Sequence, residues 1–320
     1  RGLRTLALPG HGRTTVLACA GTGFDPIRKT PLAMCTIKTR DDVKLYVKDH
    51  GTGRPVVLLH GWPLSADTFD DLALAITKAG MRAISYDRRG FGRSEQPYAG
   101  YEYDTLADDL ADVMNELDLN DATLIGFSMG GGEVARYLSR HGSSRVSQAV
   151  LISSVVPYML KTDTNPHGVE QKVFDGMAES ILKDRPHFWA GFFKDFYGVG
   201  LLEKPVSEEV LHWSNHMAMQ GGLKATLDCA AAFATTDFRP DLKSFTVPTL
   251  ILHGTADTTV PIDPTGREAH KGIPGSKLVE YQGAAHGLLA TDKEQIASDV
   301  LAFITEGVTR DLVDIQSQVA

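Results

Sequence analysis

The chain has 320 residues, of which 42% are hydrophobic, and its formal net charge is -8 at pH 7. The hydrophobic fraction supplies a large core, and the negative charge argues against nucleic acid or a membrane surface as a partner, because both attract basic proteins. Three cysteines without a C-x-x-C spacing, and no apolar stretch near the ~20 residues that cross a bilayer, predict a reducing, cytoplasmic location.

The first 33 residues differ from the rest of the chain. Residues 1–33 are rich in Gly, Pro, Thr and Arg and show neither a helical nor a strand period. The string VLAC at 16–19 resembles a lipoprotein cleavage site, but the segment PGHGR at 9–13 interrupts the apolar region that such a signal needs. We therefore expect residues 1–33 to be a disordered or appended extension.

Alternating strand and helix patterns follow in chain order. An antiparallel hairpin is predicted over 36–50, because apolar and polar residues alternate on either side of a turn. A fully apolar strand at 55–61 precedes a helical pattern at 66–79. The pattern then repeats, with strands at 82–87, 122–127 and 148–154 and helices at 104–119 and 132–142. This alternation predicts a mostly parallel sheet with helices on its faces.

The pattern changes at Pro157. The following segment is helix-like and carries clustered aromatic residues, and strand patterns return only at 247–254 and 276–283, before a helix at about 290–306. The simplest architecture is one α/β domain with a helical insertion. Its predicted parts are a core at 34–156 and 241–306, a helical cap at 157–240 and a C-terminal tail at 307–320.

A candidate nucleophile lies between a strand and a helix. Gly126, Ser128 and Gly130 form G-x-S-x-G directly after the apolar strand at 122–127. In such a turn the serine backbone is strained and its hydroxyl projects above the sheet. A Cβ two residues before or after the serine would clash, which explains both glycines.

A serine hydroxyl needs a base to take its proton, and that base needs an acid to orient it. His286 follows the last strand pattern, so its loop and Ser128 share the carboxyl edge of the sheet. Asp257 follows the penultimate strand and gives the order serine, acid, histidine. Asp263 is the competing acid, although we expect it to cap the next helix.

The oxyanion of a tetrahedral intermediate needs hydrogen-bond donors. We predict the backbone N–H groups of Met129, at the start of a helix, and of Trp62, after the strand at 55–61. Apolar side chains near the nucleophile predict a substrate pocket lined by Trp62, Phe127, Phe192 and Phe193.

Other polar residues have simpler interpretations. His60 is expected to support a loop, and His253 to be a core or rim residue whose hydrogen bonds are satisfied. His212 and His216 have i, i+4 spacing, but the intervening residues lack the glutamate of a zinc protease motif. In YDRRGFGRSEQP, Asp87 is expected to form a buried pair with an arginine. We therefore predict no metal site and no cofactor.

Four ordered segments carry a family resemblance: HGWPLSADTFD, YDRRGFGRSEQP, GFSMGGGEVARY and LILHGTADTTVP. The chain resembles an α/β-hydrolase, and more narrowly the cofactor-free bacterial haloperoxidase (perhydrolase) and arylesterase group, over nearly all of its length except the ends. The resemblance implies a Ser128–Asp257–His286 triad with the amides of Trp62 and Met129 as oxyanion donors.

The resemblance also implies an activity. Members hydrolyse small esters through an acyl-enzyme, some act on lactones, and the acyl group can pass to water or to hydrogen peroxide, without metal or haem. Members often form homo-oligomers. A serine at position 128 argues against haloalkane dehalogenases and epoxide hydrolases, which need aspartate there. Carbon–carbon bond hydrolases, which commonly have asparagine where Phe127 lies, lactonases and hydrolase-like ligand receptors remain alternatives.

Overall fold

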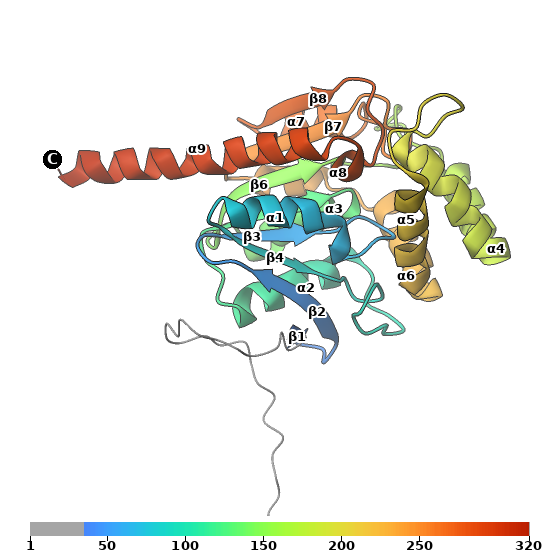
Figure 1. Ribbon diagram of the computed structural model, residues 1–320, viewed down its shortest axis with the longest axis horizontal. Helices are drawn as coiled ribbons and strands as arrows, with labels where there is room; N and C mark the ends of the chain where they lie inside the picture. Colours follow the sequence, from blue (N-terminus) through green and yellow to red (C-terminus); the bar gives the residue numbers. More distant parts are fainter. Residues whose placement is uncertain (1–34, 320) are drawn as a thin grey trace, which may run out of the picture.

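A single eight-stranded sheet forms the centre of the molecule in the computed structural model, which describes residues 35–319 (Figure 1). The extension expected at 1–33 lies outside the described residues. The strand order is β1-β2-β4-β3-β5-β6-β7-β8. The strands are β1 (Cys35–Lys38), β2 (Lys44–His50), β3 (Pro55–Leu59), β4 (Arg82–Tyr86), β5 (Ala122–Phe127), β6 (Val146–Ile152), β7 (Thr249–Gly254) and β8 (Lys277–Tyr281).

The sheet is parallel except at one edge. β1 pairs with β2, and β2 with β4, in the antiparallel sense, whereas all pairs from β4 to β8 are parallel. Every residue of β5 and β7 is buried, as expected for strands covered on both faces. The predicted α/β-hydrolase fold, with its mostly parallel central sheet, is therefore confirmed.

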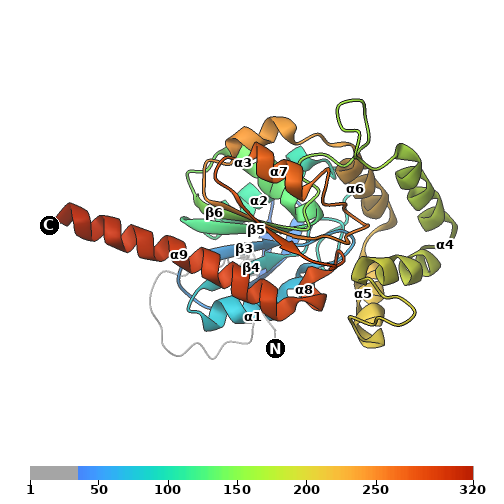
Figure 2. The ribbon, with the colours of Figure 1, turned by 90° about the horizontal axis from the view of Figure 1, so that it is seen from above.

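Helices cover both faces of the sheet (Figure 2). Helices α1 (Asp70–Lys78) and α9 (Lys293–Val319) pack together on one face, and α2 (Tyr103–Glu116) packs with α3 (Met129–His141) on the other. The short elements are η1 (Ala66–Phe69), η2 (Arg239–Ser244), α7 (Gly266–Gly272) and α8 (Leu288–Thr291). The parallel strands consequently present one common carboxyl edge, at which the loops after β3, β5 and β7 meet.

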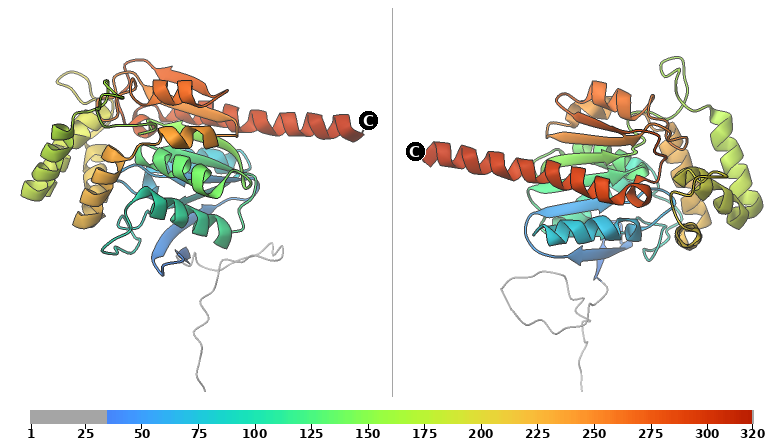
Figure 3. Two further views of the ribbon diagram at one scale, coloured as in Figure 1. Left: turned by 180° about the vertical axis from the view of Figure 1, so that it is seen from behind. Right: turned by 45° about the horizontal axis from the view of Figure 1, so that its top comes forward.

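Three further helices lie at that carboxyl edge, within the segment 157–240 that we call the cap (Figure 3). They are α4 (Gln171–Tyr197), α5 (Glu208–Gln220) and α6 (Leu223–Thr235). Helix α4 is kinked at Asp184, two residues before Pro186, where Asp184 Oδ1 accepts a hydrogen bond from the backbone N–H of His187 at 3.1 Å. The kink has two causes, because proline lacks the N–H of a continuous helix and the aspartate caps the second half.

Two helices differ in length from the sequence prediction. Helix α3 begins at Met129, as expected for the predicted oxyanion donor, and therefore includes Gly130 and Gly131, which lie outside the helical pattern predicted at 132–142. Helix α9 continues to Val319 through the expected tail at 307–320. The sequence accounts for this longer helix, because apolar residues recur at positions 308, 312, 315 and 319, the spacing of one helical face. Among the described residues, no helix is long and apolar enough to span a membrane.

Candidate active site

Ser128 lies in a strained turn between β5 and α3. Its backbone has φ 54° and ψ -118°, a conformation that side-chain-bearing residues rarely adopt. The turn is held by the backbone N–H of Ser128, which donates to the carbonyl oxygen of Ile152 in β6 at 2.8 Å. The serine is therefore fixed at the carboxyl edge of the sheet by a hydrogen bond to a neighbouring strand.

The glycines on either side of Ser128 allow backbone segments to approach one another closely. A Cβ at Gly126 would lie 2.5 Å from the carbonyl oxygen of Gly130 and 2.6 Å from Cα of Gly131. A Cβ at Gly130 would collide with the carbonyl oxygen of Leu59 at the end of β3. Because these neighbours are backbone atoms, no side-chain rotation could make room for a methyl group.

The three side chains nominated from the chain order lie in one hydrogen-bonded line. His286 Nε2 lies 3.0 Å from Ser128 Oγ, and His286 Nδ1 lies 2.6 Å from Asp257 Oδ2. All three residues are buried. Since a carboxylate only accepts hydrogen bonds, Nδ1 carries the proton and Nε2 is left to accept from the serine hydroxyl. This is the tautomer that a general base requires.

The Asp257 carboxylate is stabilised in its ionised form. Its Oδ1 accepts backbone hydrogen bonds from Thr259 at 3.0 Å and Val260 at 2.8 Å. Burial alone would raise its pKa, but the electrostatic interaction with His286 and the contacts with two histidines lower the pKa to about 2. A negative charge is therefore present beside His286 throughout the neutral range.

The structure places Asp263 away from this cluster. Its side chain is 63% exposed and pairs with Arg267 Nη1 at 2.6 Å. The expectation that Asp263 caps the next helix is wrong, because α7 has Thr265 at its N-cap position and no side-chain cap hydrogen bond. Asp263 lies in the turn before that position, and its carboxylate is taken up by an arginine one helical turn further on.

The predicted oxyanion donors belong to two segments that adjoin Ser128. Met129 is the first residue of α3, and the first N–H groups of a helix have no partner inside it. The loop that carries Trp62 touches the nucleophile, since a Cβ at Gly61 would be 3.0 Å from Ser128 Cβ. The helix N-terminus also favours negative charge at this point.

Trp62 lies in a cluster of aromatic rings from the cap. Its ring contacts Trp189 at 5.1 Å, Phe192 at 5.6 Å and Phe233 at 5.3 Å between ring centres, all edge to face. Its indole N–H donates to the carbonyl oxygen of Thr226 in α6 at 2.9 Å. The cap is thus attached to the loop of the expected oxyanion donor. Trp62 and Phe192, two of the residues predicted to line the pocket, lie side by side.

Phe127 and Phe193 have different surroundings. Phe127 packs against His286 at 5.2 Å between ring centres and lines a cavity of about 170 Å³ together with Phe196 and Gly287. Phe193 is fully buried, and its ring contacts fall on other residues of α4, so it packs within the cap. The sequence pattern predicts a pocket position for Phe193 but not for Phe196, whose ring lies 4.7 Å from that of His286. Both belong to one aromatic run, and only the packing distinguishes them.

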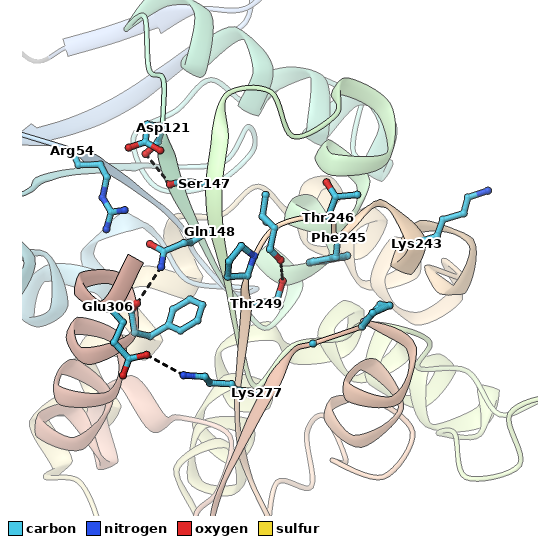
Figure 4. Close-up of a pocket in the computed structure, with 15 residues that line it drawn as sticks. Arg54, Asp121, Ser147, Gln148, Lys243, Phe245, Thr246, Thr249, Lys277 and Glu306 are labelled. Atoms are coloured by element: carbon cyan, nitrogen blue, oxygen red, sulfur yellow. Dashed lines mark hydrogen bonds and ion pairs between the residues drawn. The ribbon is translucent and has the colours of Figure 1, made fainter. Parts of the chain in front are cut away.

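A larger cavity, of about 790 Å³, lies at the opposite edge of the sheet (Figure 4). Gln148, Thr249 and Lys277, near the starts of β6, β7 and β8, line it together with Phe303 of α9. Glu306 closes one side through an ion pair with Lys277 at 3.0 Å. None of the three candidate triad residues reaches this cavity.

Buried charged side chains support the loop after β4. Arg88 and Glu133 form an ion pair in which both side chains are 1% exposed, and Tyr86 donates to the same carboxylate at 3.2 Å. Burial raises the pKa of Glu133 to about 7 against the opposing effect of Arg88. His60 Nε2 accepts from the backbone N–H of Arg88 at 2.9 Å, which is the loop-supporting role predicted for it. The Arg88–Glu133 ion pair links α3 to the loop after β4.

The remaining sequence expectations concern paired and metal-binding groups. Asp87 is buried and pairs with Arg93 at 2.7 Å, as predicted for this motif. His212 and His216 lie on α5. Within the part of the chain that the structure describes, no group of three or more His, Cys, Asp or Glu side chains could hold a metal ion.

Comparison with known proteins agrees with this fold. Residues 54–293 match the family described as alpha/beta hydrolase fold, and the chain belongs to that family. It is 43% identical to the non-heme chloroperoxidase CPO-A1 of Kitasatospora aureofaciens over 86% of this chain and 100% of the relative. It is 42% identical to the bifunctional esterase/perhydrolase DCH of Acinetobacter calcoaceticus, over 84% of this chain and 98% of the relative.

A solved structure has the same fold as this chain. The bromoperoxidase from Bacillus anthracis superposes with a TM-score of 0.82 at 42% identity, covering 85% of this chain and 99% of the other. The resemblance to the haloperoxidase and esterase group, inferred from four sequence segments, is therefore confirmed.

Proposed function

We propose that the protein is a serine hydrolase that cleaves small carboxylic esters through an acyl-enzyme and transfers the acyl group to water or hydrogen peroxide. The observation that carries the proposal is the continuous hydrogen-bonded line from Ser128 Oγ through His286 to Asp257. The names of the relatives, a chloroperoxidase and an esterase/perhydrolase, support the choice of acyl acceptors.

In the acylation step, His286 Nε2 takes the proton of Ser128 as Oγ attacks the ester carbonyl carbon. The carbonyl oxygen becomes an oxyanion that accepts hydrogen bonds from the N–H groups of Met129 and Trp62, and each such donor contributes about 3 kcal/mol. His286 then gives its proton to the alcohol oxygen, the carbon–oxygen bond breaks, and the acyl group stays on the serine. Asp257 stabilises the imidazolium formed in between.

In the deacylation step, the same histidine activates the acceptor. It removes a proton from water or hydrogen peroxide, the acceptor oxygen attacks the acyl carbon, and Ser128 leaves with the proton returned by His286. Water gives a carboxylic acid and hydrogen peroxide gives a peracid. The peracid carries the oxidising equivalent of the peroxide, so halide oxidation follows in solution without a redox centre in the protein.

The test is turnover of p-nitrophenyl acetate by the purified protein and by Ser128→Ala. We expect the variant to lose at least about 10³-fold in kcat, since no other nucleophile replaces the serine. Ser154, buried nearby just after the end of β6, provides a matched control, and Ser154→Ala should keep most of the activity. Undiminished turnover in Ser128→Ala would refute the proposal.

The perhydrolase part is tested separately. Acetate and hydrogen peroxide are supplied together with bromide, and bromination of a dye is followed. We expect bromination that depends on both acetate and Ser128. Ester hydrolysis without bromination would limit the function to an esterase, and tight ligand binding without any turnover would favour the receptor alternative.

A further inference from the structure

A second histidine contacts the carboxylate of Asp257. His253, at the end of β7, is fully buried, and its Nε2 lies 3.4 Å from Asp257 Oδ2. The same Oδ2 is the atom that His286 Nδ1 approaches at 2.6 Å. Two imidazoles from different segments therefore converge on one carboxylate oxygen, and only one of them belongs to the proposed triad.

The hydrogen bonds of His253 define its tautomer. Nε2 also lies 2.8 Å from the carbonyl oxygen of Val260, so it faces two acceptors and must carry the proton. Nδ1 is buried without a hydrogen-bond partner, so the expectation that the hydrogen bonds of His253 are all satisfied is wrong. A ring with its proton on Nε2 and none on Nδ1 satisfies this arrangement: the N–H donates to the Val260 carbonyl, and the Asp257 carboxylate oxygen lies 3.4 Å from the same nitrogen as a longer, electrostatic contact.

These contacts close a small hydrogen-bonded unit around the acid. Val260 donates its backbone N–H to Asp257 Oδ1 at 2.8 Å and accepts from His253 through its carbonyl. His253 therefore holds both the carboxylate and the turn that holds the carboxylate. It does so from β7, which is paired with β6 and β8 on its two sides, whereas Asp257 itself lies in a loop.

Packing keeps the ring of His253 in place. A Cβ at Gly266, the first residue of α7, would lie 2.8 Å from Nδ1, so the helix backbone lies directly against this side of the imidazole. A histidine is a costly choice for a purely structural position here, because its Nδ1 acceptor is left unsatisfied. An apolar ring of similar size would fill the space without that cost, so the Nε2–H is the feature that the site uses.

We infer that His253 is a positioning residue of the active site: its Nε2–H fixes the orientation of the Asp257 carboxylate, and through it the hydrogen bond that aligns His286. The inference rests on the proposed role of Asp257 as the acid of the triad. The contacts of His253 fall on Asp257, Val260 and the backbone of Gly266, so we expect its loss to lower the rate of the chemical step and to leave substrate affinity unchanged.

The test compares His253→Phe with His253→Gln in the full chain. Phenylalanine keeps the ring shape but has no donor, whereas the amide nitrogen of glutamine reaches the place of Nε2 and restores one. We expect kcat for p-nitrophenyl acetate to fall about 10-fold or more in His253→Phe with KM nearly unchanged, and to recover most of this loss in His253→Gln. Thermal unfolding of both variants shows whether they remain folded.

A spectroscopic readout separates positioning from stability. The proton between His286 Nδ1 and Asp257 Oδ2 should give a far-downfield ¹H resonance because the hydrogen bond is short. We expect this resonance to broaden or move upfield in His253→Phe and to stay in place in His253→Gln. If His253→Phe does not fold, His253→Asn, whose shorter amide cannot reach the Nε2 position, replaces it.

Three results would overturn the inference: wild-type kcat in folded His253→Phe, equal losses in the Phe and Gln variants, or an unchanged resonance in His253→Phe. Failure of the proposed function looks different, because the wild-type protein would then show no turnover that depends on Ser128. In that case the resonance still tests whether His253 orients Asp257.

Discussion

The close backbone approach at the nucleophile gives a quantitative prediction for Gly126→Ala. The added methyl group would lie 2.6 Å from Cα of Gly131, and ordinary contact begins at 3.4 Å. The first turn of α3 therefore has to move by about 0.8 Å relative to β5, and it takes Ser128 and the Met129 amide with it. A misplacement of about 1 Å costs roughly 100-fold in rate, so we expect kcat to fall by a factor of that order.

Stability gives the same substitution a second readout. Alanine is intrinsically better than glycine in a strand or helix by about 0.5–1 kcal/mol, so without a clash Gly126→Ala would stabilise the protein. With the clash we expect a net loss of about 1–3 kcal/mol. The matched control is Gly176→Ala on α4, where an added Cβ meets nothing within 4 Å and should leave kcat unchanged while stability rises slightly.

The assays are p-nitrophenyl acetate kinetics and urea unfolding of both variants. Wild-type kcat in Gly126→Ala, together with a stability gain like that of Gly176→Ala, would refute the argument that close backbone packing fixes the nucleophile. A loss of kcat in Gly176→Ala would show instead that the assay responds to any glycine substitution.

Three further predictions follow from the described contacts. Replacing Glu133 by leucine leaves the buried Arg88 guanidinium without its carboxylate, so urea unfolding should show a loss of about 3–5 kcal/mol, and a loss below about 1 kcal/mol would contradict this role of the pair. The pKa of Asp257 is about 2 in the folded protein, against an ordinary value of 3.8, so its ionised form contributes about 2.5 kcal/mol above pH 4 that is lost as the pH falls through 2. The stability difference between wild type and Asp257→Asn should shrink by most of that amount between pH 5 and pH 2, and a constant difference would disprove it. Phe192→Ala opens space beside Trp62, so kcat/KM for p-nitrophenyl hexanoate relative to acetate should rise about 10-fold, whereas an unchanged ratio would place the acyl chain elsewhere.

Much of the fold could be predicted because its signals are local. Fully apolar strands, amphipathic helices and the glycines around Ser128 each reflect a short-range requirement of backbone geometry. The order of serine, acid and histidine then nominated one residue of each kind, since loops after parallel strands share an edge. The extension of α9 to Val319 was missed although its apolar spacing is present, because the chain end was interpreted as a tail.

What the sequence alone determined was the fold class, the turn that exposes Ser128 and the short set of polar residues that could work with it, because these depend on local conformation and chain order. Only the tertiary structure showed that Asp257 and not Asp263 contacts His286, placed Phe196 against His286, and brought His253 to the carboxylate of Asp257. Those outcomes depend on which side chains meet across loops and the cap, and neither propensity nor periodicity contains that information.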